Sequence, residues 1–204
     1  MEIKKINDLY SDENTYFLIE KGDAIVIDPG CPYEKIKEFS KDIKIKYIFL
    51  THCHFDHISS VNQIIDETGA LVCCSRECEE NIKNVNISLT TMGLGRPETI
   101  DKADIILKDG DEFDFNGNKI KVIKTPGHTN CSVCYKAGNV LFTGDTLFYQ
   151  SVGRHDLPTG NGSVLHNSIK TKIYNLPNET LIYPGHGRES TVGYEKKFNF
   201  FVKG

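Results

Sequence analysis

Three histidines and an aspartate crowd into one short segment of this chain, residues 51–57 (THCHFDH). In an extended stretch, residues two apart point the same way, so His52 and His54 can reach one ion together. Asp56 and His57 are adjacent, so both can reach a second ion only if the chain turns there. Because the 204 residues include only 7 histidines, this clustering argues against scattered surface groups and predicts a metal site.

Three later residues are further candidate metal ligands, since each follows an expected strand and lies beside glycine. They are His128 in TPGHT, Asp145 in TGDT and His186 in YPGHG. Glycine at such points lets the backbone come close to an ion and its ligands. Imidazole and carboxylate donors suit zinc, and also iron or manganese. We therefore expect two divalent metal ions, with zinc as the first choice.

Short strands and helices alternate along the chain and must position these residues. An apolar run at 47–50, typical of a buried strand, ends directly before the 51–57 segment. Lys21-Gly22-Asp23 separates two strand-like runs, as in a hairpin. Further strands are predicted at 16–19, 24–27, 70–74, 105–107, 111–115, 119–124, 131–135, 139–143 and 181–183. Helices are predicted at 33–41, 58–68, 75–83 and 163–174, the last capped by Ser163.

Composition bounds the class of protein. The length and the proportions of 39% hydrophobic and 25% charged residues fit one soluble domain over residues 1–204. A formal net charge of −4 offers no basic face for nucleic acid. There is no signal peptide and no apolar run of membrane-spanning length, so we expect a cytoplasmic protein with no membrane partner. The odd number of cysteines, 7, indicates free thiols in a reducing compartment.

The order of these motifs resembles the metallo-β-lactamase fold superfamily, and within it the short, single-domain hydrolases related to glyoxalase II. The HxHxDH motif is followed by GDTLF at 144–148 and by Gly153-Arg154. The resemblance implies an α/β (α+β) fold, a four-layer αββα sandwich with two mixed sheets face to face and helices outside. Only 18 residues follow His186 (204 − 186), too few for the C-terminal helical domain that grips glutathione in full-length glyoxalase II enzymes.

The resemblance also implies how seven side chains share two ions. The first ion would be bound by three imidazoles, those of His52, His54 and His128. The second ion would be bound by Asp56, His57 and His186, and Asp145 would bridge the two ions. A hydroxide held between the ions would attack a carbonyl carbon, while Asp56 orients that hydroxide and can accept its proton.

The implied enzyme is a metal-dependent hydrolase of a small-molecule thioester (an S-acyl thiol), similar to hydroxyacylglutathione hydrolase. Mono-iron persulfide dioxygenases are the alternative, since they share the fold, a Thr-His-Cys-His-like motif and a Gly-Arg-x-Asp segment like 153–156. A lactonase or a non-catalytic binding module is a weaker alternative. The complete second-ion set favours the hydrolase. β-Lactamases of this superfamily often have cysteine where Asp145 stands, which argues against antibiotic hydrolysis.

Three residues near the predicted ligands are candidate substrate contacts. The guanidinium of Arg154 could bind a substrate carboxylate in a two-pronged way. It could equally form an ion pair with Asp156, two residues on. Phe148 and Tyr149 are plausible pocket walls and equally plausible core residues. The acyl group, the thiol carrier and the oligomeric state stay open.

Overall fold

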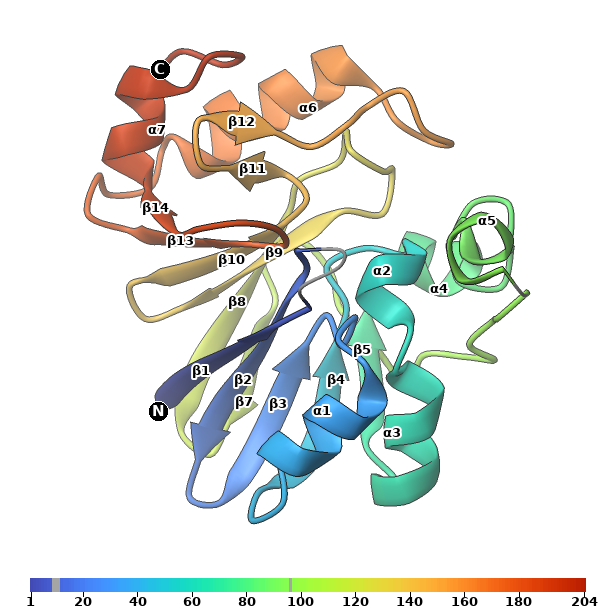
Figure 1. The fold of residues 1–204 in the computed structure, drawn as a ribbon. Coiled ribbons are helices and arrows are strands. Elements are labelled where there is room, and N and C mark those ends of the chain that lie inside the picture. Colours follow the sequence, from blue (N-terminus) through green and yellow to red (C-terminus); the bar gives the residue numbers. More distant parts are fainter. Residues whose placement is uncertain (9–11, 96) are drawn as a thin grey trace. The chain divides into compact units, whose positions relative to one another are not determined.

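The computed structural model describes residues 1–8, 12–95 and 97–204. The chain forms two compact units, Met1–Leu107 (unit 1) and Lys108–Gly204 (unit 2). Each unit is built on its own six-stranded mixed sheet, accompanied by helices (Figure 1). The prediction of two mixed sheets with helices is therefore confirmed.

The sheet of unit 1 has the strand order β1-β2-β3-β4-β5-β6. Its strands are β1 (Glu2–Asn7), β2 (Asn14–Glu20), β3 (Asp23–Ile27), β4 (Lys44–Phe49), β5 (Leu71–Cys74) and β6 (Ile105–Ile106). Neighbours from β1 to β3 run antiparallel, and neighbours from β3 to β6 run parallel. The strands of the parallel part have apolar sequences because helices cover them and bury their side chains (Figure 1). The strand β1, on the sheet edge, was not predicted.

The first hairpin of unit 1 confirms the predicted turn. Strands β2 and β3 pair from Tyr16 with Ile27 to Glu20 with Asp23. Lys21 and Gly22, the two residues between them, have φ angles of 54° and 83°. Positive φ at both central residues is the geometry that matches the twist of a two-residue hairpin.

The helices of unit 1 differ from the prediction at the motif itself. They are α1 (Tyr33–Phe39), α2 (Phe55–Ile58), α3 (Val61–Thr68), α4 (Arg76–Asn81) and α5 (Thr90–Leu94). The helix predicted at 58–68 is confirmed over Val61–Thr68 as α3, but its predicted start is wrong, since a separate short helix begins at Phe55 and ends at Ile58. The hydroxyls of Ser59 and Ser60 donate to the carbonyls of Gly30 and Cys31, at 2.8 and 2.6 Å. These side-chain bonds to another loop separate α2 from α3.

The sheet of unit 2 has the order β14-β13-β10-β9-β8-β7. Its strands are β7 (Glu112–Phe115), β8 (Asn118–Lys124), β9 (Val133–Ala137), β10 (Val140–Gly144), β13 (Leu181–Pro184) and β14 (Ser190–Thr191). Only β10 and β13 pair in parallel, and the other neighbours are antiparallel. A small separate sheet pairs β11 (Leu147–Phe148) with β12 (Ser151–Val152).

The helices of unit 2 are α6 (Gly162–Ser168), continued by a π-helical turn at Ile169–Ile173, and α7 (Val192–Phe198). The predicted cap Ser163 is wrong. Asn161 caps α6 instead, because its side-chain oxygen accepts the N–H of Val164 at 3.1 Å.

The sequence predicts free thiols, and the structure confirms this. All seven cysteines are free, and all are buried. Within the described residues, no helix is long and apolar enough to cross a lipid bilayer.

Candidate metal centre

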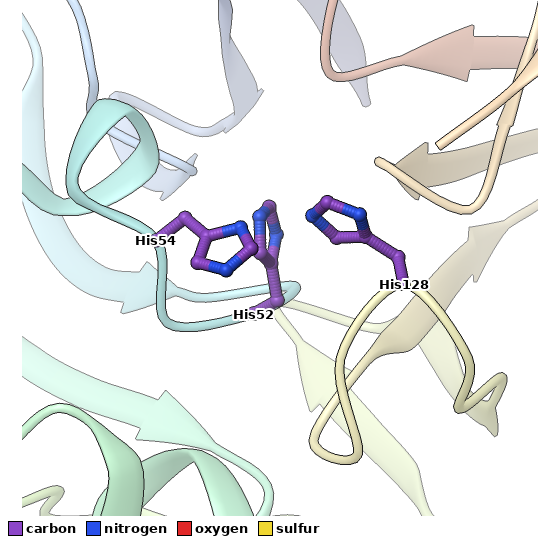
Figure 2. Close-up of side chains that lie close together, drawn as sticks. All are labelled: His52, His54 and His128. Carbon is purple, nitrogen blue, oxygen red and sulfur yellow. The ribbon is translucent and has the colours of Figure 1, made fainter. Parts of the chain in front are cut away.

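Three predicted ligands of unit 1 are imidazoles buried beyond the end of β4. His52, His54 and His57 expose 1%, 3% and 0% of their surface. The rings of His52 and His54 lie edge to face, with centroids 4.8 Å apart (Figure 2). The ring of His57 lies 4.2 Å from that of His52. A protein core does not normally gather three histidines without a shared partner.

Helix α2 supplies the turn that Asp56 and His57 need. His54 is the last extended residue before it, with φ −69° and ψ 149°. Within α2, a carboxylate oxygen of Asp56 lies 3.9 Å from Nε2 of His57. The sequence predicted such a turn but placed the helix start near Ile58, and the observed start at Phe55 puts both residues inside the helix.

Asp28, at the end of β3, holds this histidine group and was not predicted. Its Oδ1 accepts the backbone N–H of Thr51 at 2.7 Å, and its Oδ2 accepts the Thr51 hydroxyl at 2.5 Å. The same Oδ2 lies 3.1 Å from Nδ1 of His57. Because the Thr51 hydroxyl donates to Asp28, its oxygen is left to accept the N–H at Nδ1 of His52, 3.1 Å away. The sequence signal that could have found it is an aspartate directly after a buried strand, in Asp28-Pro29-Gly30.

These hydrogen bonds fix which ring nitrogen can bind metal. With the proton of His52 and of His57 held at Nδ1, the lone pair of each ring is at Nε2. Histidines that bind metal nearly always donate their other N–H to such a carboxylate or to another oxygen. The nearest donor atoms of Asp28, His52 and His57 lie within 4.8 Å of one another. Both Asp28 oxygens are already engaged, so we assign Asp28 a positioning role.

Close packing beneath α2 depends on Gly30 and on a buried acid. A Cβ added at Gly30 would lie 1.6 Å from the carbonyl oxygen of Asp56 and 2.7 Å from Cδ of Glu13. Glu13 is fully buried. Its burial raises the pKa of the carboxyl well above the ordinary value, and nearby Asp28 raises it too, whereas His57 lowers it.

In unit 2, Asp145 faces two histidines with its two oxygens. It follows β10 directly, and His186 follows β13, the parallel neighbour of β10. Oδ2 of Asp145 lies 3.6 Å from Nε2 of His128, and Oδ1 lies 3.6 Å from Nε2 of His186. One carboxylate thus presents a separate oxygen to each imidazole, and a parallel strand pair brings Asp145 and His186 to one edge of the sheet.

The orientation of His128 is set by the loop after β12. Its Nδ1 donates to the carbonyl oxygen of Arg154 at 2.6 Å, which leaves Nε2 as the possible metal donor. Gly153, beside it, has no room for a side chain. A Cβ there would lie 1.8 Å from the carbonyl oxygen of Asp145 and 3.1 Å from Nδ1 of His128.

Replacing Gly153 with alanine should therefore displace Asp145 and His128 together. We expect weaker metal retention by ~10-fold or more, as for loss of a ligand-orienting contact, measured by competition with a chromophoric chelator. Gly138→Ala is the matched control, because Gly138 has φ 57° and a Cβ added there would meet no atom within 4 Å. Equal losses in the two variants would attribute the effect to general destabilisation.

Comparison with known proteins identifies the family of this chain. The family model of the metallo-beta-lactamase superfamily matches residues 11–186. The chain belongs to the metallo-beta-lactamase superfamily. That match ends at His186, the last of the seven predicted ligands.

Curated relatives within the superfamily include named hydrolases. A probable metallo-hydrolase of Streptococcus pyogenes serotype M6 is 34% identical over 98% of this chain and 90% of its own length. The hydroxyacylglutathione hydrolase GloC of Haemophilus influenzae is 29% identical, covering 90% of this chain and 89% of its own.

Solved structures of the superfamily confirm the predicted fold class. BLEG-1, described as a B3 metallo-beta-lactamase, matches with a TM-score of 0.93, 33% identity and 100% coverage of both chains. ETHE1 from Myxococcus xanthus matches with a TM-score of 0.82 and 29% identity, over 99% of this chain and 84% of its own. TTHA1623 in a di-iron-bound form matches with a TM-score of 0.86 and 29% identity, over 98% of this chain and 100% of its own.

The three candidate substrate contacts lie in unit 2. Arg154 pairs with Asp156, with Nε to Oδ1 and Nη2 to Oδ2 distances of 3.0 Å each. Both side chains are exposed, so the pair adds little stability. The half-buried ring of Phe148 meets that of His186 edge to face at 6.0 Å, and the ring of Tyr149 stacks on Tyr194 at 5.2 Å. Contact of any of them with substrate stays a prediction.

Proposed function

We propose that this chain is a binuclear metal-dependent hydrolase of thioesters. The observation that carries the proposal is the two-sided Asp145 carboxylate, 3.6 Å from His128 on one oxygen and 3.6 Å from His186 on the other. Two atoms bound tetrahedrally to one zinc ion, each at roughly 2.1 Å, lie roughly 3.4 Å apart. Each oxygen–nitrogen pair of Asp145 therefore fits one ion, and the carboxylate fits a bridge between two.

The donors of unit 1 suit the remaining coordination positions. His52 and His54 offer two imidazoles for one ion, and the Asp56–His57 pair offers one carboxylate and one imidazole for the other. We propose that these four side chains and the three of unit 2 bind two ions jointly, with zinc the first choice and iron or manganese as alternatives. The di-iron form of the neighbour TTHA1623 supports two-ion binding on this fold.

The chain's own groups then have separate tasks. When bound, two divalent cations would supply Lewis-acid chemistry, lowering the pKa of a water molecule to about 7 and polarising a carbonyl. The Asp56 carboxylate, half-buried in α2, orients the attacking water and accepts its proton. Asp28 and Thr51 keep the protons of His57 and His52 on Nδ1, so that the rings cannot turn away.

The thioester substrate is supported by GloC of Haemophilus influenzae, a hydroxyacylglutathione hydrolase. The likeness to ETHE1 and the Arg154–Asp156 pair in the 153–156 segment support the second candidate, a mono-iron persulfide dioxygenase. A full second-ion set that includes His186 favours the hydrolase, because a dioxygenase iron needs only two histidines and one carboxylate.

Metal analysis and two assays separate these candidates. Protein purified without added metal should contain two ions per chain and release thiol from S-lactoylglutathione without oxygen uptake. One iron per chain, with oxygen uptake on glutathione persulfide and no thiol release, would reject the hydrolase. A chromogenic β-lactam belongs in the same series because BLEG-1 is described as a B3 metallo-beta-lactamase, and we expect no turnover of it.

A further inference from the structure

Arg188 lies in the loop between β13 and β14, two residues after His186. Its guanidinium carbon sits over the ring of Tyr149, 3.4 Å from the centroid. The side chain is exposed. No carboxylate of the described residues pairs with it. A positive charge two residues after a proposed metal ligand therefore has no acidic partner in the described part of the chain.

The surface beneath Arg188 is rigidly built. The Tyr149 ring stacks on Tyr194 at 5.2 Å with 20° between the planes, and their hydroxyls hydrogen-bond at 2.7 Å. The amide of Gln150 donates to the Tyr194 hydroxyl at 2.7 Å. Buried Glu195 accepts the backbone N–H of Gln150 at 2.9 Å, which ties the loop after β11 to α7. Because these contacts fix Tyr149, an arginine stacked on it loses little further freedom when it binds a ligand.

Stacking on Tyr149 leaves the N–H edge of the Arg188 guanidinium available to bind a carboxylate. The guanidinium binds carboxylates through N–H groups in its own plane, whereas the ring of Tyr149 covers only its face. Arg154 differs, because Asp156 already occupies its Nε and Nη2 donors at 3.0 Å each. Of these two arginines, Arg188 is the one whose N–H edge has no carboxylate partner among the described residues.

We propose that Arg188 binds a carboxylate on the thiol carrier of the substrate. The substrate class is then an acyl thioester whose carrier is acidic, such as a small peptide thiol. This inference rests on the proposed thioester hydrolysis. Arg188 would then determine substrate specificity, although it is not one of the three candidate contacts Arg154, Phe148 and Tyr149.

The test compares a charged with a neutral carrier. The substrates are S-lactoylglutathione and its diethyl ester, in which both carboxyl groups are esterified. Arg188→Gln should raise KM for the charged substrate by ~10- to 100-fold, the worth of a hydrogen bond between charged groups. It should leave kcat within about twofold, since uniform binding affects KM alone. KM for the diester should not change. Arg188→Lys, which keeps the charge but not the fork, should fall in between.

Two further variants make the result specific. Arg76→Gln is the matched control, since Arg76 is an exposed arginine of unit 1 that pairs with Glu79. Arg76→Gln should change neither the KM for S-lactoylglutathione nor the KM for its diethyl ester. Arg154→Gln tests the competing residue. Selective loss of the charged substrate in Arg154→Gln but not in Arg188→Gln would overturn the proposal, as would equal losses of both substrates in Arg188→Gln.

Direct binding separates this inference from the proposed function. Calorimetry with glutathione and with its diethyl ester, on the metal-loaded protein, should show tighter binding of glutathione, and Arg188→Gln should abolish the difference. If the wild-type protein hydrolyses neither thioester, the proposed function fails. The binding preference for glutathione over its diester then tests by itself whether Arg188 binds a carboxylate. If the wild-type protein binds glutathione no more tightly than the diester, the proposed role of Arg188 is overturned.

Discussion

Alanine at His54 or at Asp145 is expected to abolish both metal retention and turnover. His54 is one of the three buried imidazoles proposed for one ion, and Asp145 is the proposed bridge. Metal activation is worth several kcal/mol of transition-state stabilisation, so kcat/KM should fall by ~1,000-fold or more. Metal content is measured by mass spectrometry of the desalted protein, and turnover by thiol release.

The two variants should differ in the number of ions lost. On the proposed assignment, Asp145→Ala would remove a ligand shared by the two ions, whereas His54→Ala would remove a ligand of one ion. His155→Ala is the control, since His155 is an exposed histidine whose ring neighbour is His166 at 6.4 Å. Wild-type metal content and activity in either ligand variant would refute the assignment of that residue.

Asparagine at Asp28 should have the second largest effect, although Asp28 is assigned no direct bond to metal. The amide has one acceptor oxygen where the carboxylate has two, so it cannot accept all three hydrogen bonds, from the Thr51 N–H, the Thr51 hydroxyl and Nδ1 of His57. Loss of such an orienting partner typically costs ~10- to 100-fold in metal affinity. A chelator competition measures that affinity on the wild-type and variant proteins.

Folding must be separated from orientation in that experiment. A buried donor left unsatisfied costs about 1–3 kcal/mol, so Asp28→Asn should also unfold at lower urea concentration. Asp66→Asn is the control, because Asp66 is an exposed aspartate on α3. Thr51→Val removes only the hydroxyl bridge between Asp28 and His52, and should weaken metal binding less than Asp28→Asn. Unchanged metal affinity in Asp28→Asn would show that Asp28 does not position the histidines.

Local sequence patterns predicted much of the fold. The hairpin at Lys21-Gly22 was predictable because two residues with positive φ suffice to define it. The strands before each candidate ligand were predictable from short apolar runs that stop at polar residues and glycine. The helix at the motif was misplaced, because its break depends on Ser59 and Ser60 bonding to the distant Gly30–Cys31 loop.

The sequence by itself determined the chemistry that is available: imidazoles and carboxylates of the right type, each beyond a strand end, in the order of one superfamily. Only the tertiary structure decided which other residues orient these imidazoles and carboxylates and which of them lie close together. Asp28 reaches Thr51 and His57 because β3 and β4 are parallel neighbours. Asp145 faces His186 because β10 pairs with β13 across 36 intervening residues (181 − 144 − 1). Arg188 acquires its aromatic support in the same way, from Tyr149. Strand order and register join residues far apart in the chain, and hydrophobic spacing encodes neither of them.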